Sequence, residues 1–353
     1  MAVLGFYQDD EHWPEFGTLT IHDTDNGDED AGPFEQWGLG GQPCGTVARA
    51  GYGWLEGSAG DGPLVVRLEV HDSAPPAESD DWSEVVETPY RSRSGAVYLT
   101  YVTGSPPEDH LRLGGVGDYR VRVATKALPA SAEGPEALWV LRFWPDATPT
   151  PPRWLRRSEP AVRSGGAGWE VLRNSPAAEL LAVVSMARDE TGRTSLDALA
   201  RWGEPRFGGP GWLAEPLPHK PDSDLDPAAL ARRLGLPEPR SAHEVLDVFV
   251  AAGVLDEDDG GYRTHLPAPR AEDVLDLPAA RRAALRQQDE HNRFASFASD
   301  LITVALWGGG EQTAAALAER TLVSEGEVRE ALDWACRAGL LVVEGEFRMA
   351  LPG

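Results

Sequence analysis

The sequence predicts an α+β fold, with an antiparallel β-sandwich first and mainly α-helical units after it. Three observations carry this prediction. Short runs of alternating apolar and polar residues, separated by Gly, Pro, Asp and Ser, fill the first part. Helical spacing dominates from residue 169 onward, and two stretches of the second half resemble each other. We therefore expect a β-sandwich with an acidic N-terminal extension (1–145), a Pro/Gly-rich linker (146–168) and two helical units (169–270 and 271–353).

The strands of the first part are predicted from residue alternation. In one run, Tyr119, Val121 and Val123 share a face, whereas Arg120 and Arg122 point to the other, as in a strand with one buried face. Five runs have strand character: 63–71, 82–90, 95–102, 118–128 and 137–144. Turn residues recur at intervals of roughly ten residues, which is typical of an antiparallel sandwich.

The predicted linker contains one basic cluster. Arg153, Arg156 and Arg157 surround Trp154 in a segment otherwise rich in Pro, Gly and Ser. The cluster either clamps an acidic partner or docks against the acidic surface of the chain's own N-terminal domain. We favour the second interpretation.

A repeat organises the second half. Residues 226–266 and 312–351 align, so that Leu246 matches Leu332 and Gly253 matches Gly339, each pair 86 residues apart. Each copy predicts a short Ala/Leu helix, a second helix that begins at a Ser, and a hairpin. A Gly ends the second helix in both copies.

This order of helix, turn, helix and hairpin resembles tandem winged helix-turn-helix proteins over roughly residues 170–353. Residues 278–308 would supply the leading helix of the second unit. The resemblance implies binding of DNA, of other proteins, or of one unit to the other.

Charge weighs against DNA. The chain has a net charge of −25, which repels phosphate backbones. The helix that would read DNA in the second copy has only Arg329 and Arg337 as basic residues, against four acids: Glu325, Glu327, Glu330 and Asp333. The equivalent segment of the first copy, 241–252, has no Lys or Arg. We therefore predict binding to another protein through Glu327, Arg329, Glu330, Asp333 and Arg337.

The DNA-binding alternative stays open because other helices could form a basic face. Its residues would be Arg232, Arg233, Arg281, Arg282, Arg286 and Arg293. Exposed arginines paired with nearby acids are the simpler interpretation.

One stretch of the first part has a more specific pattern. A strand ending in His-Asp is followed by a Pro-Pro loop, an Asp-Trp pair and a strand that restarts after Ser-Gly; a Gly turn then leads into a Tyr-Arg strand. The residues are Pro75, Pro76, Asp81, Trp82, Gly95, Gly117, Tyr119 and Arg120. Over about residues 60–146 this order is similar to competence protein J-like domains, small β-sandwiches whose founding member inhibits a partner nuclease. The resemblance implies a binding module, and its candidate partner-binding residues are Asp72, Asp81, Trp82 and Glu84.

Motifs for catalysis, cofactors and metals are not found in the sequence. A calcium loop counted from Asp23 fails at Asp28 and Phe34, and no phosphate-binding glycine motif lies between a strand and a helix. With only Cys44 and Cys336 and no long apolar run, we expect a cytoplasmic protein. The predicted function is a non-enzymatic, protein-binding regulator or immunity-type inhibitor with an acidic surface and a basic partner; the alternative is a transcription regulator.

Overall fold

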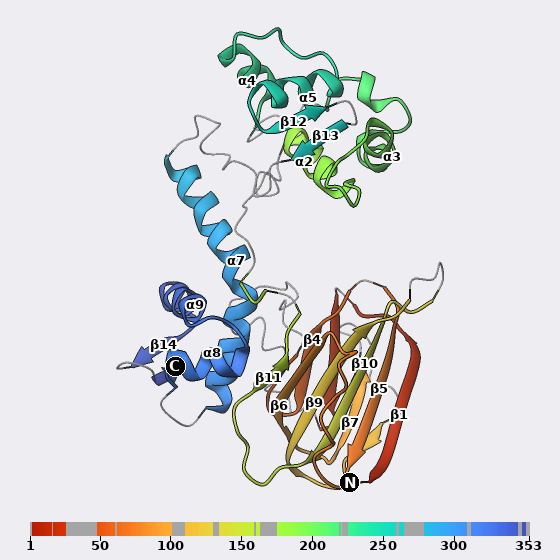
Figure 1. Ribbon diagram of the computed structural model, residues 1–353, viewed down its shortest axis with the longest axis vertical. Helices are drawn as coiled ribbons and strands as arrows, with labels where there is room; N and C mark the ends of the chain where they lie inside the picture. The colour runs from red at the N-terminus through yellow and green to blue at the C-terminus, as the bar shows by residue number, and fades with distance from the viewer. Residues whose placement is uncertain are drawn as a thin grey trace. The chain divides into compact units, whose positions relative to one another are not determined.

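The computed structural model shows a mixed α+β protein (Figure 1). It describes residues 2–15, 17–25, 48–60, 62–100, 110–129, 134–158, 160–162, 175–218, 220, 225–258, 261–264, 279–308, 312–344 and 348–350. The chain divides into two compact units. Unit 1 comprises residues 1–163 and 294–353, and unit 2 comprises residues 164–293. The four-part division expected from the sequence has other boundaries and stays a prediction.

A six-stranded sheet forms one layer of unit 1. Its strand order is β1 (Val3–His12), β5 (Leu64–His71), β10 (Ala137–Pro145), β9 (Gly117–Ala127), β6 (Glu84–Ser92) and β11 (Arg153–Arg156). The prediction of purely antiparallel pairing is wrong at one place, because β5 and β10 run parallel. Residue alternation is the same in both kinds of pair, so it does not reveal strand direction.

A five-stranded sheet forms the second layer. Its order is β3 (Arg49–Ala50), β4 (Trp54–Ser58), β2 (Thr18–Asp23), β7 (Ala96–Thr100) and β8 (Leu111–Arg112). The two sheets share one apolar core. Leu19, Ile21 and Leu99 come from this sheet, and Val123 and Leu141 come from the other. Burial of these alternating side chains is the main force that holds the layers together.

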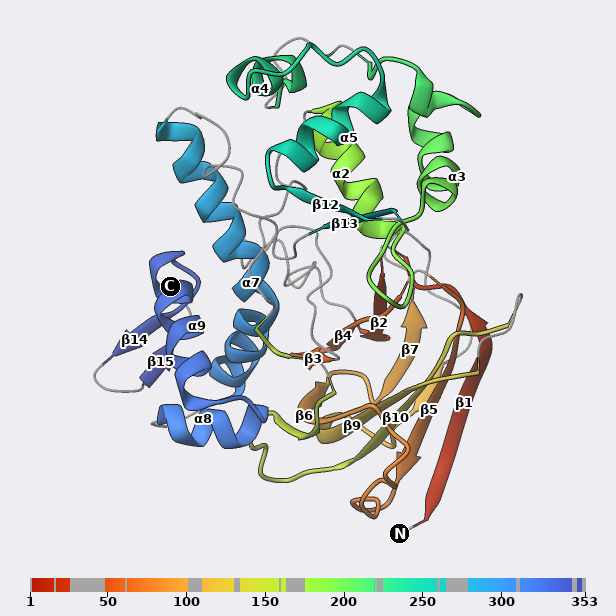
Figure 2. The same cartoon turned by 45° about the horizontal axis from the view of Figure 1, so that its top comes forward.

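Strands at the start and end of the first part escaped the sequence analysis. The acidic N-terminal extension contains β1, and the predicted linker contains β11, which pairs antiparallel with β6. Both are edge strands, at the two ends of the strand order (Figure 1), and β1 is also outermost in Figure 2. Edge strands tolerate polar and charged residues, so their hydrophobic pattern is weak.

Helices complete unit 1. The last part of α7 (Ala279–Trp307) packs with α8 (Ala314–Thr321) and α9 (Glu325–Arg337), and β14 (Val342–Glu344) pairs with β15 (Arg348–Ala350). Their apolar core includes Phe297, Leu301, Leu317, Val328 and Ala335. No helix among the described residues is both long and apolar enough to span a membrane.

Unit 2 is mainly helical. It contains α2 (Pro176–Met186), α3 (Leu196–Phe207), a 3₁₀ turn at Trp212–Ala214, α4 (Pro227–Arg233), α5 (Ala242–Ala251) and the hairpin β12 (Leu255–Asp258) with β13 (Gly261–Thr264). Its core is built around Leu180, Leu199, Trp212, Leu246 and Phe249.

The sequence repeat is visible in the structure. The order helix, helix, hairpin occurs as α4–α5–β12–β13 and again as α8–α9–β14–β15. Ser241 and Ser324 cap the second helix of each copy through their side-chain oxygens. The matched leucines Leu246 and Leu332 are both buried.

Candidate protein-binding surfaces

The exposed face of α9 is acidic. The buried side of this helix is Val328, Ala331, Leu332, Trp334 and Ala335. Because the helical period places the remaining positions outward, all five predicted binding residues lie on or beside the solvent side. Four of them, Arg329, Glu330, Asp333 and Arg337, are exposed, and Glu327 is half-buried.

Two of the predicted binding residues on α9, Glu327 and Arg329, form hydrogen bonds or ion pairs with residues at the start of the same helix. Glu327 completes a capping box with Ser324, whose backbone N–H and hydroxyl both donate to the Glu327 carboxylate, at 3.2 and 2.6 Å. Arg329 pairs with Glu325 one turn earlier at 2.5 Å. This pair offsets one charge of each sign. Of the other exposed charges on α9, Glu330 and Asp333 outnumber Arg337, so the face stays acidic.

The equivalent face in unit 2 is also acidic. On α5, Glu244 and Asp247 are exposed, and Glu244 accepts a hydrogen bond from the backbone N–H of Arg240. On β12, Asp256, Glu257 and Asp258 are all exposed.

A hollow of about 570 Å³ beside this hairpin is lined by Asp197, Glu257, Asp258 and Tyr262, among others. Burial and the nearby carboxylates of Glu257 and Asp247 raise the pKa of Tyr262 to about 12. Its phenol therefore stays uncharged at neutral pH. The lining acids give the hollow its charge, and Arg193 offsets one of them by pairing with Asp258 at 2.5 Å.

The candidates in the first part occupy different environments. Asp72 and Asp81 are exposed, and Asp72 accepts a hydrogen bond from the backbone N–H of Ala2 at 2.8 Å. Glu84 accepts two hydrogen bonds from Ser158, at 2.6 and 2.8 Å.

Trp82 is only 9% exposed and packs on Val85, Ala124 and Val140. The Lys126 amine lies over its ring, 5.0 Å from the centroid. For Trp82 the structure shows a packing role on the outer face of the sheet, not the exposed ring that a partner contact needs. The sequence did not indicate that the Trp82 ring is buried, because its neighbour Asp81 is exposed.

An ion-pair network that the sequence analysis missed covers the outer face of the six-stranded sheet. Glu87 on β6 is 2% exposed and binds Arg122 at 2.7 Å and Arg153 at 2.7 Å. Burial disfavours the charged form of Glu87, but hydrogen bonds from these two arginines outweigh it, so the pKa of Glu87 is lowered. On the same face Glu78 pairs with Arg142 at 2.5 Å.

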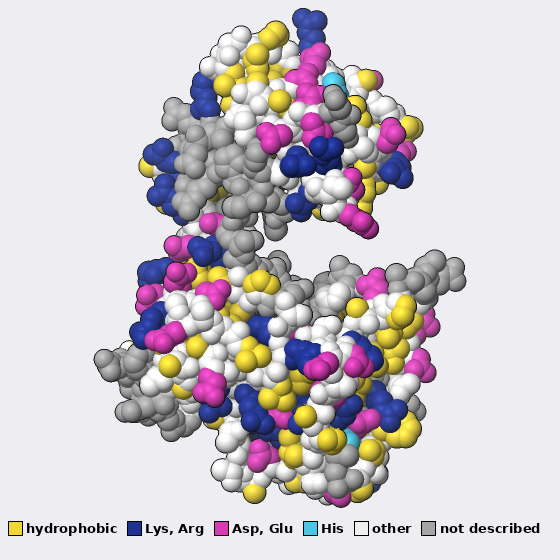
Figure 3. Space-filling model, viewed as in Figure 1, with side chains coloured by type: hydrophobic (Ala, Val, Ile, Leu, Met, Phe, Trp, Pro, Cys, Tyr) yellow, Lys and Arg dark blue, Asp and Glu magenta, His cyan; other side chains and the backbone are white. Residues whose placement is uncertain are grey.

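Interleaved basic and acidic side chains are visible on this face in Figure 3. The outward arginines of β9 and β10, which are Arg120, Arg122 and Arg142, therefore pair with acids of the same unit. Pairing requires strands far apart in sequence to be neighbours, so local patterns could not reveal it.

The basic cluster of the predicted linker binds within unit 1. Two of its arginines dock on the N-terminal domain, as the favoured interpretation holds, and the third binds α7 instead. Arg153 pairs with Glu87 and Arg156 pairs with Asp80 at 2.5 Å. Arg157 pairs with Asp300 of α7 at 2.8 Å, where both side chains are almost fully buried.

A second polar contact joins the five-stranded sheet to α7. Arg49, fully buried, donates to the Ser299 hydroxyl at 2.5 Å and pairs with Glu56 at 3.3 Å. Trp307 donates its indole N–H to the Ala50 carbonyl at 2.7 Å. Burial raises the pKa of Glu56 to about 7, although Arg49 acts in the opposite direction. Hydrogen bonds from Arg49 and Trp307 thus hold the last part of α7 against the five-stranded sheet.

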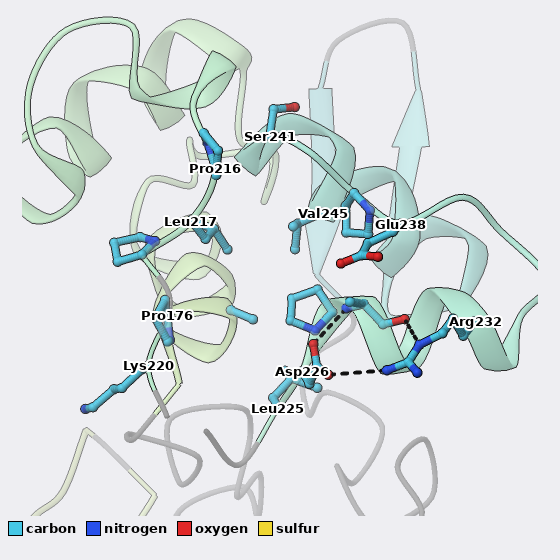
Figure 4. A pocket seen from close by; sticks show the side chains of 15 residues that line it. Pro176, Pro216, Leu217, Lys220, Leu225, Asp226, Arg232, Glu238, Ser241 and Val245 are labelled. Atoms are coloured by element: carbon cyan, nitrogen blue, oxygen red, sulfur yellow. Dashed lines mark hydrogen bonds and ion pairs between the residues drawn. The ribbon is translucent and has the colours of Figure 1, made fainter. Parts of the chain in front are cut away.

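Unit 2 contains a cavity of about 520 Å³ between α2, α4 and the start of α5 (Figure 4). Leu217, Leu225 and Val245 supply apolar lining, and the volume lies in the range of small-molecule sites. Charges of both signs are present in the lining: Lys220 and Arg232 against Asp226 and Glu238. Asp226 caps α4 and pairs with Arg232 at 3.9 Å. With the charges balanced, the cavity selects neither an anion nor a cation.

Residues 224–345 match the model of a family of unknown function, DUF6042. No curated protein matches the chain.

Two solved structures are similar to part of the chain. One is the crystal structure of ComJ, inhibitor of the DNA degrading activity of NucA, from Bacillus subtilis, with 10% identity, a TM-score of 0.31, and coverage of 41% of this chain and 100% of that chain. The other is described as crocagin biosynthetic gene J, with 15% identity, a TM-score of 0.29, and coverage of 40% and 99%. At such scores neither carries an argument about mechanism. No comparison identifies the helical repeats as winged helices.

Proposed function

We propose that this protein is a non-enzymatic, protein-binding regulator whose partner presents a basic surface. The observation that carries the proposal is the solvent face of α9, where Glu330 and Asp333 are exposed and Arg329 is paired with Glu325. Opposite charge speeds association with a basic partner and disfavours an anionic one.

The helix, helix, hairpin order of both repeats supports the finer proposal that each is a winged helix. In such a module the second helix and the hairpin would form the binding surface. In unit 2 these are α5 and β12–β13, where Glu244, Asp247, Asp256, Glu257 and Asp258 are exposed. The two modules therefore share one sign of charge on equivalent faces.

An immunity or inhibitor role is one form of this proposal. Enzymes that act on nucleic acid present a basic cleft, and an acidic protein face is complementary to it. The net charge of −25 supports that form.

DNA binding is the second candidate, and the exposed Arg232 and Arg233 of α4 favour it. Arg232 lies 3.9 Å from Asp226, which offsets part of its charge. Sequence-specific retardation of a duplex by the wild-type protein, weakening steeply with salt, would establish this candidate in place of protein binding.

The experiment that tests the proposal compares two charge-reversal variants. Proteins captured from the source organism would be identified, purified and titrated with the full chain. We expect Glu330→Lys with Asp333→Lys to weaken a genuine complex by at least about tenfold. The control, Glu190→Lys, changes an exposed acid of unit 2 outside both repeats and leaves affinity unchanged. Equal affinity of all the variants would contradict the proposal.

A further inference from the structure

Strand β1 is the edge of the six-stranded sheet. It pairs with β5 on one side, with continuous register from Gly5↔Val70 to Asp9↔Val66. No strand among the described residues pairs with its other side. β1 is the outermost strand of its sheet in Figures 1 and 2. At ten residues it is long for an edge strand.

The first half of β1 is exposed and apolar. Val3 is 49% exposed, Leu4 65% and Phe6 59%, and Trp13 just beyond the strand is 51% exposed. Proteins usually protect a long edge with charged side chains, above all Lys, or with Pro, a bulge or a short strand. In β1 the acids and one register shift lie in the second half, and a further shift lies between Val3 and Gly5. Residues 3–8 of β1 contain no Lys and no Pro. An exposed apolar edge of this length favours pairing with another strand.

The second half of β1 is acidic. Asp9, Asp10 and Glu11 follow the apolar residues, and Asp10 and Glu11 are exposed. In the apolar half, the Arg67 guanidinium lies over the Phe6 ring, 4.5 Å from its centroid. The edge is therefore polarised along its length, apolar at one end and anionic at the other.

Self-pairing fits this polarity poorly. A two-fold antiparallel pair of β1 strands centred on the strand would set Leu4 and Phe6 of one copy against the acidic end of the other. Neither half would then meet its complement. A strand from another protein, with one apolar half and one basic half, would be complementary to both halves of β1.

We propose that β1 is a strand-addition site for an extended segment of a partner protein. The segment runs antiparallel to β1, with apolar side chains beside Leu4 and Phe6 and Lys or Arg beside Asp10. Main-chain hydrogen bonds supply affinity, and the side chains set register and direction. This surface is separate from α9 and does not depend on the function proposed for that helix.

The test uses a defined probe. A fluorescein-labelled ten-residue peptide would carry two Lys at its N-terminal end, followed by alternating Val and Thr. In an antiparallel arrangement with the first Lys opposite Asp10, the second Lys is opposite Asp9 and Val residues lie opposite Phe6 and Leu4. We expect saturable binding to the full chain, measured by fluorescence anisotropy, and no binding would overturn the proposal.

N-methylation distinguishes strand addition from loose apolar contact. Two further peptides would be methylated at alternate backbone nitrogens, one at odd and one at even positions. Only one set of N–H groups faces β1 in an added strand. One methylated peptide should therefore lose binding and the other retain it. Equal binding by both would contradict the proposal.

Substitutions in the chain complete the test. Phe6→Lys and Asp10→Lys should each weaken peptide binding by at least about tenfold. The control is Val116→Lys, at a position 71% exposed between β8 and β9, and it should bind as wild type. Circular dichroism would establish that all three fold.

Two further readouts separate this proposal from its alternatives. Unchanged affinity in Phe6→Lys would overturn it. A concentration-dependent dimer that Phe6→Lys abolishes would assign the edge to a second copy instead. Retained peptide binding in the α9 double variant, Glu330→Lys with Asp333→Lys, would show that the two surfaces act independently.

Discussion

Gly253 and Gly339 adopt the same left-handed backbone after the second helix of the two repeats, with φ values of +71° and +73°. They lie 86 residues apart, one in each unit. Each follows the last turn of its helix, and its N–H bonds back to a carbonyl three residues earlier. Glycine adopts this conformation without the steric penalty of a Cβ atom.

Replacing either glycine with alanine should therefore cost similar stability. An added Cβ meets no atom within 4 Å at either position, so the cost comes from the backbone alone. We expect Gly253→Ala and Gly339→Ala each to lower the free energy of unfolding by about 1 kcal/mol. Urea unfolding of the full chain would measure it.

Gly326→Ala is the matched control. This glycine lies in α9, where a Cβ also meets nothing within 4 Å and φ is not positive. Alanine favours the helix there and should stabilise by up to about 1 kcal/mol. Destabilisation by Gly326→Ala of the same size as in the other two would contradict the argument from backbone conformation.

The buried pair of Arg157 and Asp300 predicts a large loss of stability on truncation. Their exposed fractions are 9% and 1%, so removal of one partner leaves the other charge buried. Asp300→Ala should destabilise unit 1 by about 3 kcal/mol. Glu325→Gln breaks the exposed pair with Arg329 and should change stability by less than about 1 kcal/mol. Thermal and urea unfolding of both variants would measure the two losses of stability. Equal losses would contradict the distinction between the buried and the exposed ion pair.

Glu56 predicts a pH-dependent stability. Its pKa is about 7 in the folded protein, against an ordinary value of 4.5 for a glutamate. Between pH 4.5 and pH 7, Glu56 is therefore protonated in the folded state and ionised in the unfolded state. The favourable contribution of protonated Glu56 is fully present below pH 4.5 and is lost as the pH rises through 7.

The variant Glu56→Gln cannot titrate at this position. We expect the stability of wild type relative to Glu56→Gln to fall by about 3 kcal/mol between pH 4.5 and pH 8, and then to level off. Unfolding curves of both proteins across this range would measure the difference. A constant difference would mean that Glu56 keeps an ordinary pKa beside Arg49.

The α9 face predicts the effect of charge on DNA affinity. Wild type should bind a mixed-sequence duplex weakly, because exposed Glu330 and Asp333 repel phosphates. Glu330→Arg with Asp333→Arg should strengthen duplex binding at low salt and steepen its salt dependence. Fluorescence anisotropy at several salt concentrations measures both. Tight wild-type binding that the substitutions weaken would reverse the assignment of this face.

The sequence by itself determined the local features of this protein. Helix starts at Ser241 and Ser324, turns at Gly253 and Gly339, and the alternation along β9 depend on residues close in the chain, so they could be predicted. Acidity of the exposed α9 face followed in the same way, because helical period alone decides which residues share a face.

Only the tertiary structure decided which distant residues meet. Neither the parallel pair β5–β10 nor the edge position of β1 leaves a local pattern. Trp82 became part of a packed cluster, and Glu87 became the centre of a buried ion-pair network, because strands far apart in sequence lie side by side. Arg49 likewise meets Ser299 across 250 residues of chain. Such contacts depend on the burial and pairing of the whole unit, and no short stretch of sequence contains both partners.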